Sequence, residues 1–113
     1  MLVEARINNA KVAPCPLEVR VAASLWSEDG RLHHWASSQG AHPVRDRLAE
    51  VYGLEPSQVR VVTPDVGGGF GAKGFPYPEE LLCPWLARRL GRPVRWFETR
   101  SESMVGLGHG RGQ

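Results

Sequence analysis

The sequence has 113 residues, of which 42% are hydrophobic and 23% charged, and a formal net charge of +2. These values are typical of one small soluble globular domain, and the charge is carried by 12 arginines and 2 lysines with no basic run longer than two residues, which excludes a nucleic-acid-binding face. No apolar run reaches the length of a membrane span and no secretory signal opens the chain, so we expect a cytoplasmic protein.

The two cysteines, Cys15 and Cys83, lie far apart in the sequence and fit no metal-ligand spacing. A disulfide between them is one possibility. Two buried free thiols in a reducing cytoplasm is the interpretation that we favour.

The amino-terminal third predicts an irregular segment and then a β-hairpin. Prolines and asparagines oppose a helix in residues 1–16. Residues 17–25 predict a strand because four apolar residues share one parity: Val19, Val21, Ala23 and Leu25. The Asp29-Gly30 pair favours a tight turn, and residues 31–36 predict the returning strand.

The middle and end of the chain predict two helices and two further strands. A helix is expected near residues 43–53, with Pro43 in its first turn and Gly53 as its cap, followed by a buried strand at 59–62. Residues 79–90 are helical in composition, with acids first and arginines last, although Pro84 predicts a kink or a late start. Residues 93–97 predict a fourth strand, and residues 98–102 lead away from it.

The predicted order is therefore β-β-α-β-α-β. We expect an α+β fold in which one helical layer covers a mixed four-stranded sheet, within a single domain of residues 1–113. The glycine-rich end of the chain, residues 106–113, is typical of a connection to a further strand, so a fragment of a longer protein is expected.

The most informative stretch is the sequence VGGGFGAKG at residues 66–74, here called the glycine loop, which follows the third strand. Five of its nine residues are glycine, so the backbone can adopt positive φ and bring bare N–H groups close to a ligand. Lys73 lies in the same loop. These features favour an anionic ligand such as a phosphate group, and the alternative is a glycine-rich turn that binds nothing.

Two common phosphate-binding loops have patterns that partly overlap with this stretch. A Walker loop fails because Lys73 is followed by glycine rather than serine or threonine. The dinucleotide pattern G-x-G-x-x-G is matched literally by Gly69, Gly71 and Gly74, and Glu98 lies roughly where a ribose-binding acid is expected. However, the prolines that follow the loop delay any helix until about Pro78, which removes the helix N-terminus that holds the pyrophosphate.

The residues resemble a known family. Residues 64–73 (PDVGGGFGAK) look like the pterin-contacting loop of the molybdenum hydroxylases, the large subunits of xanthine dehydrogenase, aldehyde oxidase and aerobic carbon monoxide dehydrogenase. The same order and spacing recur in further motifs, which extend the resemblance over nearly the whole chain: residues 35–40 (WASSQG), 92–96 (RPVRW), 99–102 (TRSE) and 109–111 (HGR).

The resemblance implies a molybdopterin cofactor and a set of contacts to it. Gln39 would donate a hydrogen bond to the apical oxo ligand of the metal. The glycine loop would contribute close approach or backbone contacts through four residues: Gly68, Gly69, Phe70 and Gly71. No side chain is expected to ligate a metal. Lys73 is expected to neutralise a helix or strand end.

Four other residues of these motifs have less specific expectations. Arg100 and Glu102 are expected to form a surface pair. His109 matches the family motif without an assigned role, as does Arg111.

The resemblance also implies what lies beyond this chain. Gly74 replaces a glutamate that holds substrate in purine-oxidising members, which points towards carbon monoxide or aldehyde-type hydroxylation with oxygen from water. The catalytic glutamate of the family lies far downstream, so this chain is not expected to be active alone. Expected partners are the rest of the large subunit and the iron–sulfur and flavin subunits. Two alternatives remain open: a non-catalytic remnant that associates with a partner chain or with itself, and a dinucleotide-binding domain.

Overall fold

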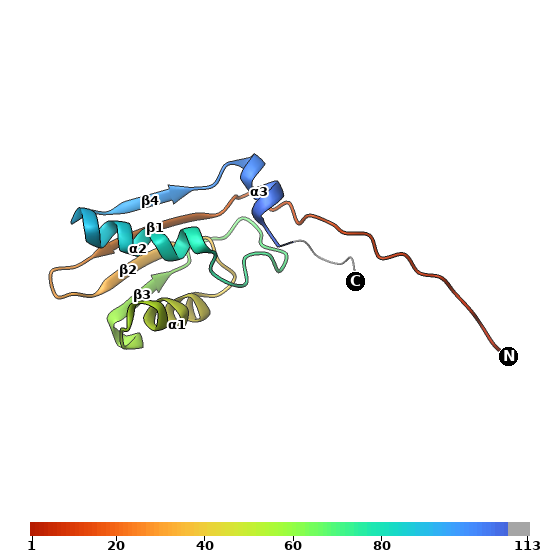
Figure 1. The fold of residues 1–113 in the computed structure, drawn as a ribbon, viewed down its shortest axis with the longest axis horizontal. Helices are drawn as coiled ribbons and strands as arrows, with labels where there is room; N and C mark the ends of the chain where they lie inside the picture. The colour runs from red at the N-terminus through yellow and green to blue at the C-terminus, as the bar shows by residue number, and fades with distance from the viewer. Residues whose placement is uncertain (109–113) are drawn as a thin grey trace.

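A computed structural model describes residues 1–108, and it has the predicted order of strands and helices with two additions (Figure 1). The additions are a short 3₁₀ helix before the third strand and a last helix. The elements are β1 (Val21–Trp26), β2 (Leu32–Ala36), α1 (Ala41–Tyr52), η1 (Pro56–Gln58), β3 (Val59–Val62), α2 (Pro78–Leu90), β4 (Val94–Phe97) and α3 (Arg100–Gly106). The segment before β1 is irregular, as expected, and its amino-terminal part extends away from the sheet.

The four strands form one mixed sheet in the order β3-β2-β1-β4. β1 is antiparallel to both β2 and β4, whereas β2 and β3 are parallel. The β1–β2 hairpin turns at Gly30, whose φ of 80° lies in the left-handed region that favours glycine. The α+β class and the mixed four-stranded sheet predicted from the sequence are confirmed.

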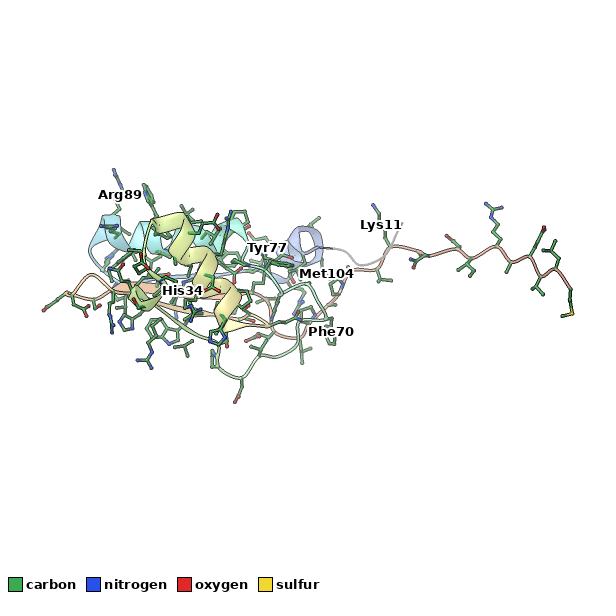
Figure 2. The ribbon with its side chains drawn as sticks, turned by 90° about the horizontal axis from the view of Figure 1, so that it is seen from below. Lys11, His34, Phe70, Tyr77, Arg89 and Met104 are labelled. Atoms are coloured by element: carbon green, nitrogen blue, oxygen red, sulfur yellow. The ribbon has the colours of Figure 1, made fainter. Side chains whose placement is uncertain are left out.

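Both long helices lie on the same side of the sheet, which gives two layers (Figure 2). The apolar core between them is made by residues from α1 and from the inward side of the strands: Leu32, Val44, Leu48, Ala49 and Val59. α1 ends at Gly53, which adopts φ of 61° and donates its N–H to the last carbonyls of the helix, as the sequence predicted.

The first strand differs from the prediction in its start and in the side that it buries. It begins at Val21 rather than at residue 17. Ala22 and Ser24 face the helices and are buried, whereas Val21 and Ala23 belong to the opposite parity. The apolar residues that predicted the strand therefore lie on the side of the sheet that the helices do not cover.

Helix α2 begins at Pro78, as the prolines after the glycine loop predicted, and it continues through Pro84. A late start near Pro84 is therefore wrong. The Pro84 carbonyl accepts a hydrogen bond from the Trp26 indole N–H at 2.8 Å, so this residue joins α2 to the end of β1. Glu79 in the first turn and Arg88 and Arg89 in the last complement the helix dipole, whereas Glu80 in the first turn is buried.

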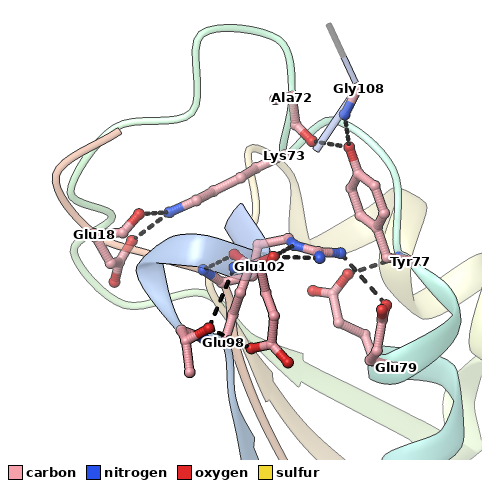
Figure 3. Close-up of polar contacts among 11 residues, drawn as sticks. Glu18, Ala72, Lys73, Tyr77, Glu79, Glu98, Glu102 and Gly108 are labelled. Carbon is pink, nitrogen blue, oxygen red and sulfur yellow. Dashed lines mark hydrogen bonds and ion pairs between the residues drawn. The ribbon is translucent and has the colours of Figure 1, made fainter. Parts of the chain in front are cut away.

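A buried ion pair extends the β1–β4 ladder by one residue beyond Val21 and Phe97 (Figure 3). Arg20 and Glu98 are both almost completely buried, and the Glu98 carboxylate accepts from the Arg20 main-chain N–H at 3.0 Å and from its Nε at 2.9 Å. The Tyr77 ring lies 3.9 Å from the Arg20 guanidinium carbon. Because Glu98 is paired inside the protein, it is not available to bind a ribose.

Helix α3 was not predicted, and its start accounts for two of the motif residues. Thr99 and Glu102 form a capping box, in which the Glu102 carboxylate accepts the Thr99 N–H at 2.7 Å. Arg100 donates to the Leu17 carbonyl at 2.7 Å. The expected surface pair between Arg100 and Glu102 is therefore wrong within residues 1–108, because each side chain has a different partner.

Both cysteines are free, so a disulfide is excluded. Cys83 is buried on α2, and burial raises the pKa of its thiol to about 11. Cys15 is exposed, which corrects the expectation that both thiols are buried. None of the helices within the described residues is both long and apolar enough to traverse a lipid bilayer.

Shortening the Leu48 side chain should cause a large loss of stability, because this side chain is completely buried between α1 and the sheet. Leu48→Ala should lower the free energy of unfolding by roughly 2–5 kcal/mol, because it removes apolar contacts and leaves a cavity. The matched control is Val51→Ala on the same helix, where the side chain is 46% exposed and the change should stay within about 0.5 kcal/mol. Urea denaturation of both variants measures the difference, and equal effects would contradict the assigned core.

The buried carboxyl of Glu80 predicts a specific pH dependence of stability. Burial raises the pKa of Glu80 from 4.5 to about 7, so between these values the folded protein keeps a proton that the unfolded chain releases. The contribution of Glu80 to stability is complete below pH 4.5 and is lost as pH rises towards 7. Relative to the native protein, Glu80→Gln should gain roughly 1–3 kcal/mol of stability between pH 4.5 and pH 8.

The pH profile of the Glu80→Gln variant must be compared with that of the native protein, because titration of buried His34 changes stability with pH in the opposite direction. Burial lowers the pKa of His34 from 6.5 to about 4, so its contribution is lost as pH falls through this range. His34 is present in both proteins and cancels in the difference. Chemical denaturation at several pH values tests the prediction, and parallel pH profiles for the two proteins would refute it. The exposed Glu50→Gln on α1 controls for loss of a surface carboxylate.

Candidate functional site

The glycine loop lies between β3 and α2, beside the segment that leaves β2, and three of its residues have positive φ. Gly68 and Gly71 have φ of 98° and 87°, and Phe70, with φ of 52°, is the only non-glycine residue with positive φ among residues 1–108. Such a conformation is unfavourable for a bulky side chain and persists only when surrounding contacts hold it. The Phe70 side chain is nevertheless 76% exposed, so its ring is presented to the outside rather than used in the core.

Gln39 holds the loop through its side-chain oxygen. Oε1 accepts hydrogen bonds from the Gly71 N–H at 2.9 Å and from the Lys73 N–H at 3.2 Å. The main-chain N–H of Gln39 also donates to the Lys73 carbonyl at 2.9 Å. With its oxygen directed to the loop, the amide group retains its nitrogen as a hydrogen-bond donor, and this nitrogen has no protein acceptor within the described part of the chain.

Two positions of the loop require glycine because neighbouring side chains lie too close for a Cβ atom, and not because of their φ angles. A Cβ at Gly69 would lie 2.4 Å from Gln39 Oε1, and one at Gly67 would lie 2.6 Å from the Glu18 side chain. A side chain at Gly69 would force the Gln39 amide or the loop to move, and one at Gly67 would force the loop away from the Glu18 segment. Among residues 1–108, the N–H groups of Gly68, Gly69 and Phe70 donate to no protein acceptor. Phe70 is exposed and Gly68 is partly exposed, whereas Gly69 is buried beside Gln39.

The Lys73 side chain points inward from the glycine loop (Figure 3). Its buried ammonium donates to the Glu18 carboxylate at 2.9 Å, to the Glu18 carbonyl at 2.8 Å and to the Ser37 hydroxyl at 2.6 Å. Partial burial of Glu18 opposes its ionisation, but hydrogen bonds from Ser37 and Lys73 hold the pKa of this carboxyl below its usual value. Lys73 is therefore a structural cation that ties three segments together, and it does not reach an external phosphate.

Tyr77 fastens the loop to α2 and to the end of the described chain (Figure 3). Its hydroxyl donates to the Ala72 carbonyl at 2.8 Å and accepts from the Gly108 N–H at 3.0 Å. The Tyr77 main-chain N–H donates to the buried Glu80 carboxyl at 2.7 Å. One side chain thus connects the loop, the start of α2 and the segment after α3.

The sequence-predicted residues Gln39, Gly68, Gly69, Phe70 and Gly71 are brought together at one end of the sheet. Gly71 differs from the others because its N–H is already donated to Gln39, so it supports the site rather than offering a free donor. The remaining motif residues His109 and Arg111 lie outside the described residues.

Sequence reasoning missed Glu18 and Tyr77, which hold the loop from two sides. Glu18 follows Pro16 and Leu17 in an irregular segment, and no periodicity or motif marks it as the partner of Lys73. Tyr77 lies between Pro76 and Pro78, and no motif marks its side chain as a support for the loop.

The chain is similar to molybdopterin-dependent proteins over its whole length. The molybdopterin cofactor-binding domain family matches residues 1–113. The nicotine 6-hydroxylase large subunit of Paenarthrobacter nicotinovorans is 39% identical over 99% of this chain and 14% of that protein. The carbon monoxide dehydrogenase large chain of Hydrogenophaga pseudoflava is 41% identical over 83% of this chain and 12% of that protein.

Solved structures give the same result. Quinoline 2-oxidoreductase from Pseudomonas putida 86 superimposes with a TM-score of 0.83 and 41% identity, covering 88% of this chain and 13% of that chain. The chain therefore spans only about one eighth of the length of the relatives that it matches. Within that span, the family match and the sequence identities agree, and the chain belongs to the molybdopterin cofactor-binding domain family.

Proposed function

We propose that this chain is the segment of a molybdenum hydroxylase large subunit that contacts the metal end of molybdopterin, through Gln39, Gly68, Gly69, Phe70 and Gly71. The Gln39 amide is the observation that carries the proposal. Its oxygen is held by two loop N–H groups, which orients the amide and leaves its nitrogen as a donor for an acceptor atom on the cofactor. The unpaired N–H groups of Gly68, Gly69 and Phe70 add donors beside it.

The cofactor fits this donor set because its oxygen and sulfur atoms are hydrogen-bond acceptors, and because Gly69, which has no side chain, lets the loop pack directly against the Gln39 amide that would donate to them. When bound, the cofactor supplies a metal centre that takes electrons from the substrate. The protein residues described above bind and orient that group. None of them is placed as a general base, so turnover is not expected from this chain alone.

The reaction that we propose for the whole large subunit is hydroxylation with oxygen taken from water. Gly74 in place of a substrate-holding glutamate favours carbon monoxide or aldehyde-type substrates over purines. The similar nicotine 6-hydroxylase adds nitrogen heterocycles to the candidates. We further propose a cytoplasmic location, which the free thiols support, and association with iron–sulfur and flavin subunits, which is supported by relatives named as large subunits.

Gln39→Glu separates the two roles of this side chain. The carboxylate retains an oxygen that accepts from Gly71 and Lys73, but it cannot donate outward to the cofactor. We expect the thermal midpoint of the chain to be almost unchanged, and its content of pterin and molybdenum to fall at least about tenfold when it is produced in a host that makes molybdopterin. Fluorescence of the oxidised pterin and mass spectrometry of molybdenum measure the content. An unchanged content would refute the role of the amide nitrogen.

Gly69→Ala should reduce the same content because the added methyl group would meet Gln39 and displace the loop. Gly106→Ala in α3 is the matched control, since the nearest atom to its added methyl group is 3.6 Å away, an ordinary contact. We expect a severalfold loss for Gly69→Ala and little change for the control. Equal contents in the two variants would show that the loop does not approach the cofactor.

The isolated chain should show no turnover with aldehydes or with carbon monoxide, whatever its cofactor content. Spectrophotometric assays with an artificial electron acceptor test this directly. Turnover above that of a cofactor-only control would overturn the proposal that the catalytic base lies elsewhere in the large subunit.

A further inference from the structure

One face of the sheet has no covering element within residues 1–108. Because side chains alternate along a strand, the residues opposite to the buried set face away from α1 and α2. The register confirms which residues share that face, since Val21 lies opposite Phe97, and Ala23 lies opposite both Trp35 and Arg95. We call this surface the uncovered face, and Figure 2 shows both long helices on the other side of the sheet.

The side chains on the uncovered face are mostly apolar, whereas the solvent-facing side of an antiparallel sheet normally carries polar side chains. Trp35 is 37% exposed and Phe97 is 70% exposed, and between them lie the small residues Val21 and Ala23. Arg60 on β3 and Arg95 on β4 have the same orientation and give part of the face a positive charge. An apolar centre of this kind beside basic residues is typical of a protein interface.

A groove of about 240 Å³ crosses the uncovered face and leads to the glycine loop. The groove is lined mainly by residues of β1, β2 and β4 and by residues 64–66, and its charged lining residues are Glu18, Asp65 and Arg95. Val66 directly precedes Gly67, the residue that packs on Glu18. A group seated in this groove would therefore contact the base of the loop from the side opposite to α2.

We propose that the uncovered face and its groove are the docking surface for the remaining polypeptide of a molybdenum hydroxylase large subunit, and that docking holds residues 64–66 and thereby the cofactor loop. This inference rests on the proposed function. The occupant is argued from length, because the relatives have most of their chain outside the matched segment. It is also argued from the position of the groove, because its lining includes residues 64–66, so that a polypeptide packed in it would contact the start of the glycine loop. An acidic rim opposite Arg60 and Arg95 is the expected complement.

The test compares one substitution in two settings. In the isolated 113-residue chain, Phe97→Glu should change the thermal midpoint by no more than about 2 °C, because the side chain is already exposed, and should reduce binding of the dye anilinonaphthalene sulfonate severalfold. The second setting is the carbon monoxide dehydrogenase large chain of Hydrogenophaga pseudoflava in which the matching segment is replaced by that of this chain. There, Phe97→Glu should reduce the yield of folded subunit at least about tenfold, because a charge is buried at the interface.

Leu82→Glu on α2 is the matched control, since Leu82 is 50% exposed on the helical side, and it should leave folded yield unchanged in both settings. Equal effects of Phe97→Glu in the two settings would overturn the proposal, and so would a chimera that does not fold even without substitutions. A dimer of the isolated chain that Phe97→Glu converts to a monomer in sedimentation would identify a second copy as the occupant and would also overturn it.

The readouts distinguish this inference from the proposed function. Folded yield and sedimentation report docking, whereas pterin and molybdenum content of the same chimera report cofactor binding. A folded chimera that is sensitive to Phe97→Glu but contains no cofactor would support docking and contradict the cofactor role. A chimera that contains cofactor and tolerates Phe97→Glu would support the cofactor role and contradict docking.

Discussion

The buried ammonium of Lys73 is the interaction on which the geometry of the loop depends. It joins the irregular segment before β1, through Glu18, to the end of β2, through Ser37, and to the loop that contains it. Removing an ammonium and a carboxylate from water is unfavourable by several kcal/mol per ion, and such a pair is tolerated only when hydrogen bonds satisfy both partners. Here the carboxylate accepts from Lys73, from the Ser37 hydroxyl and from the Gly67 N–H. This satisfied network explains how a loop with five glycines holds one conformation.

With Lys73 used internally, the outer surface of the loop offers backbone donors, the Gln39 amide and the exposed Phe70 ring. Gln39 anchors the loop with its oxygen, while the strained backbone at Phe70 turns the chain between Gly69 and Gly71. A preorganised set of neutral donors suits a ligand whose acceptor atoms must be held in a defined orientation. The same donor set is less suited to a phosphate that a helix N-terminus would hold. Helix α2 starts only at Pro78, and the buried Glu80 carboxyl already occupies its first turn.

The site was predictable where local chemistry determines structure. The glycines at 68 and 71 have the positive φ that only glycine adopts easily, Gly53 caps α1, and the prolines after Lys73 delay α2, and each of these effects acts within a few residues. Contacts between distant segments were not predictable in the same way. The pairs Glu18–Lys73 and Arg20–Glu98 join residues 55 and 78 positions apart, and no sequence pattern selects one carboxylate among 12 acidic residues. Helix α3 is an exception, because its capping box of Thr99 and Glu102 is a local signal, and the sequence interpretation treated residues 98–102 only as the exit from β4.

The sequence by itself determined the order of strands and helices, the α+β class and the resemblance to molybdenum hydroxylases, because periodicity, turn residues and a specific loop motif are local signals. Only the tertiary structure decided which side of each strand is buried. Alternation in β1 correctly predicted a strand, yet the helices cover Ala22 and Ser24 and leave Val21 and Ala23 on the other face, because the positions of α1 and α2 determine which parity is inside. The structure likewise decided that Lys73 faces inward and Gln39 supports the loop, since both depend on segments that meet only after the sheet has formed.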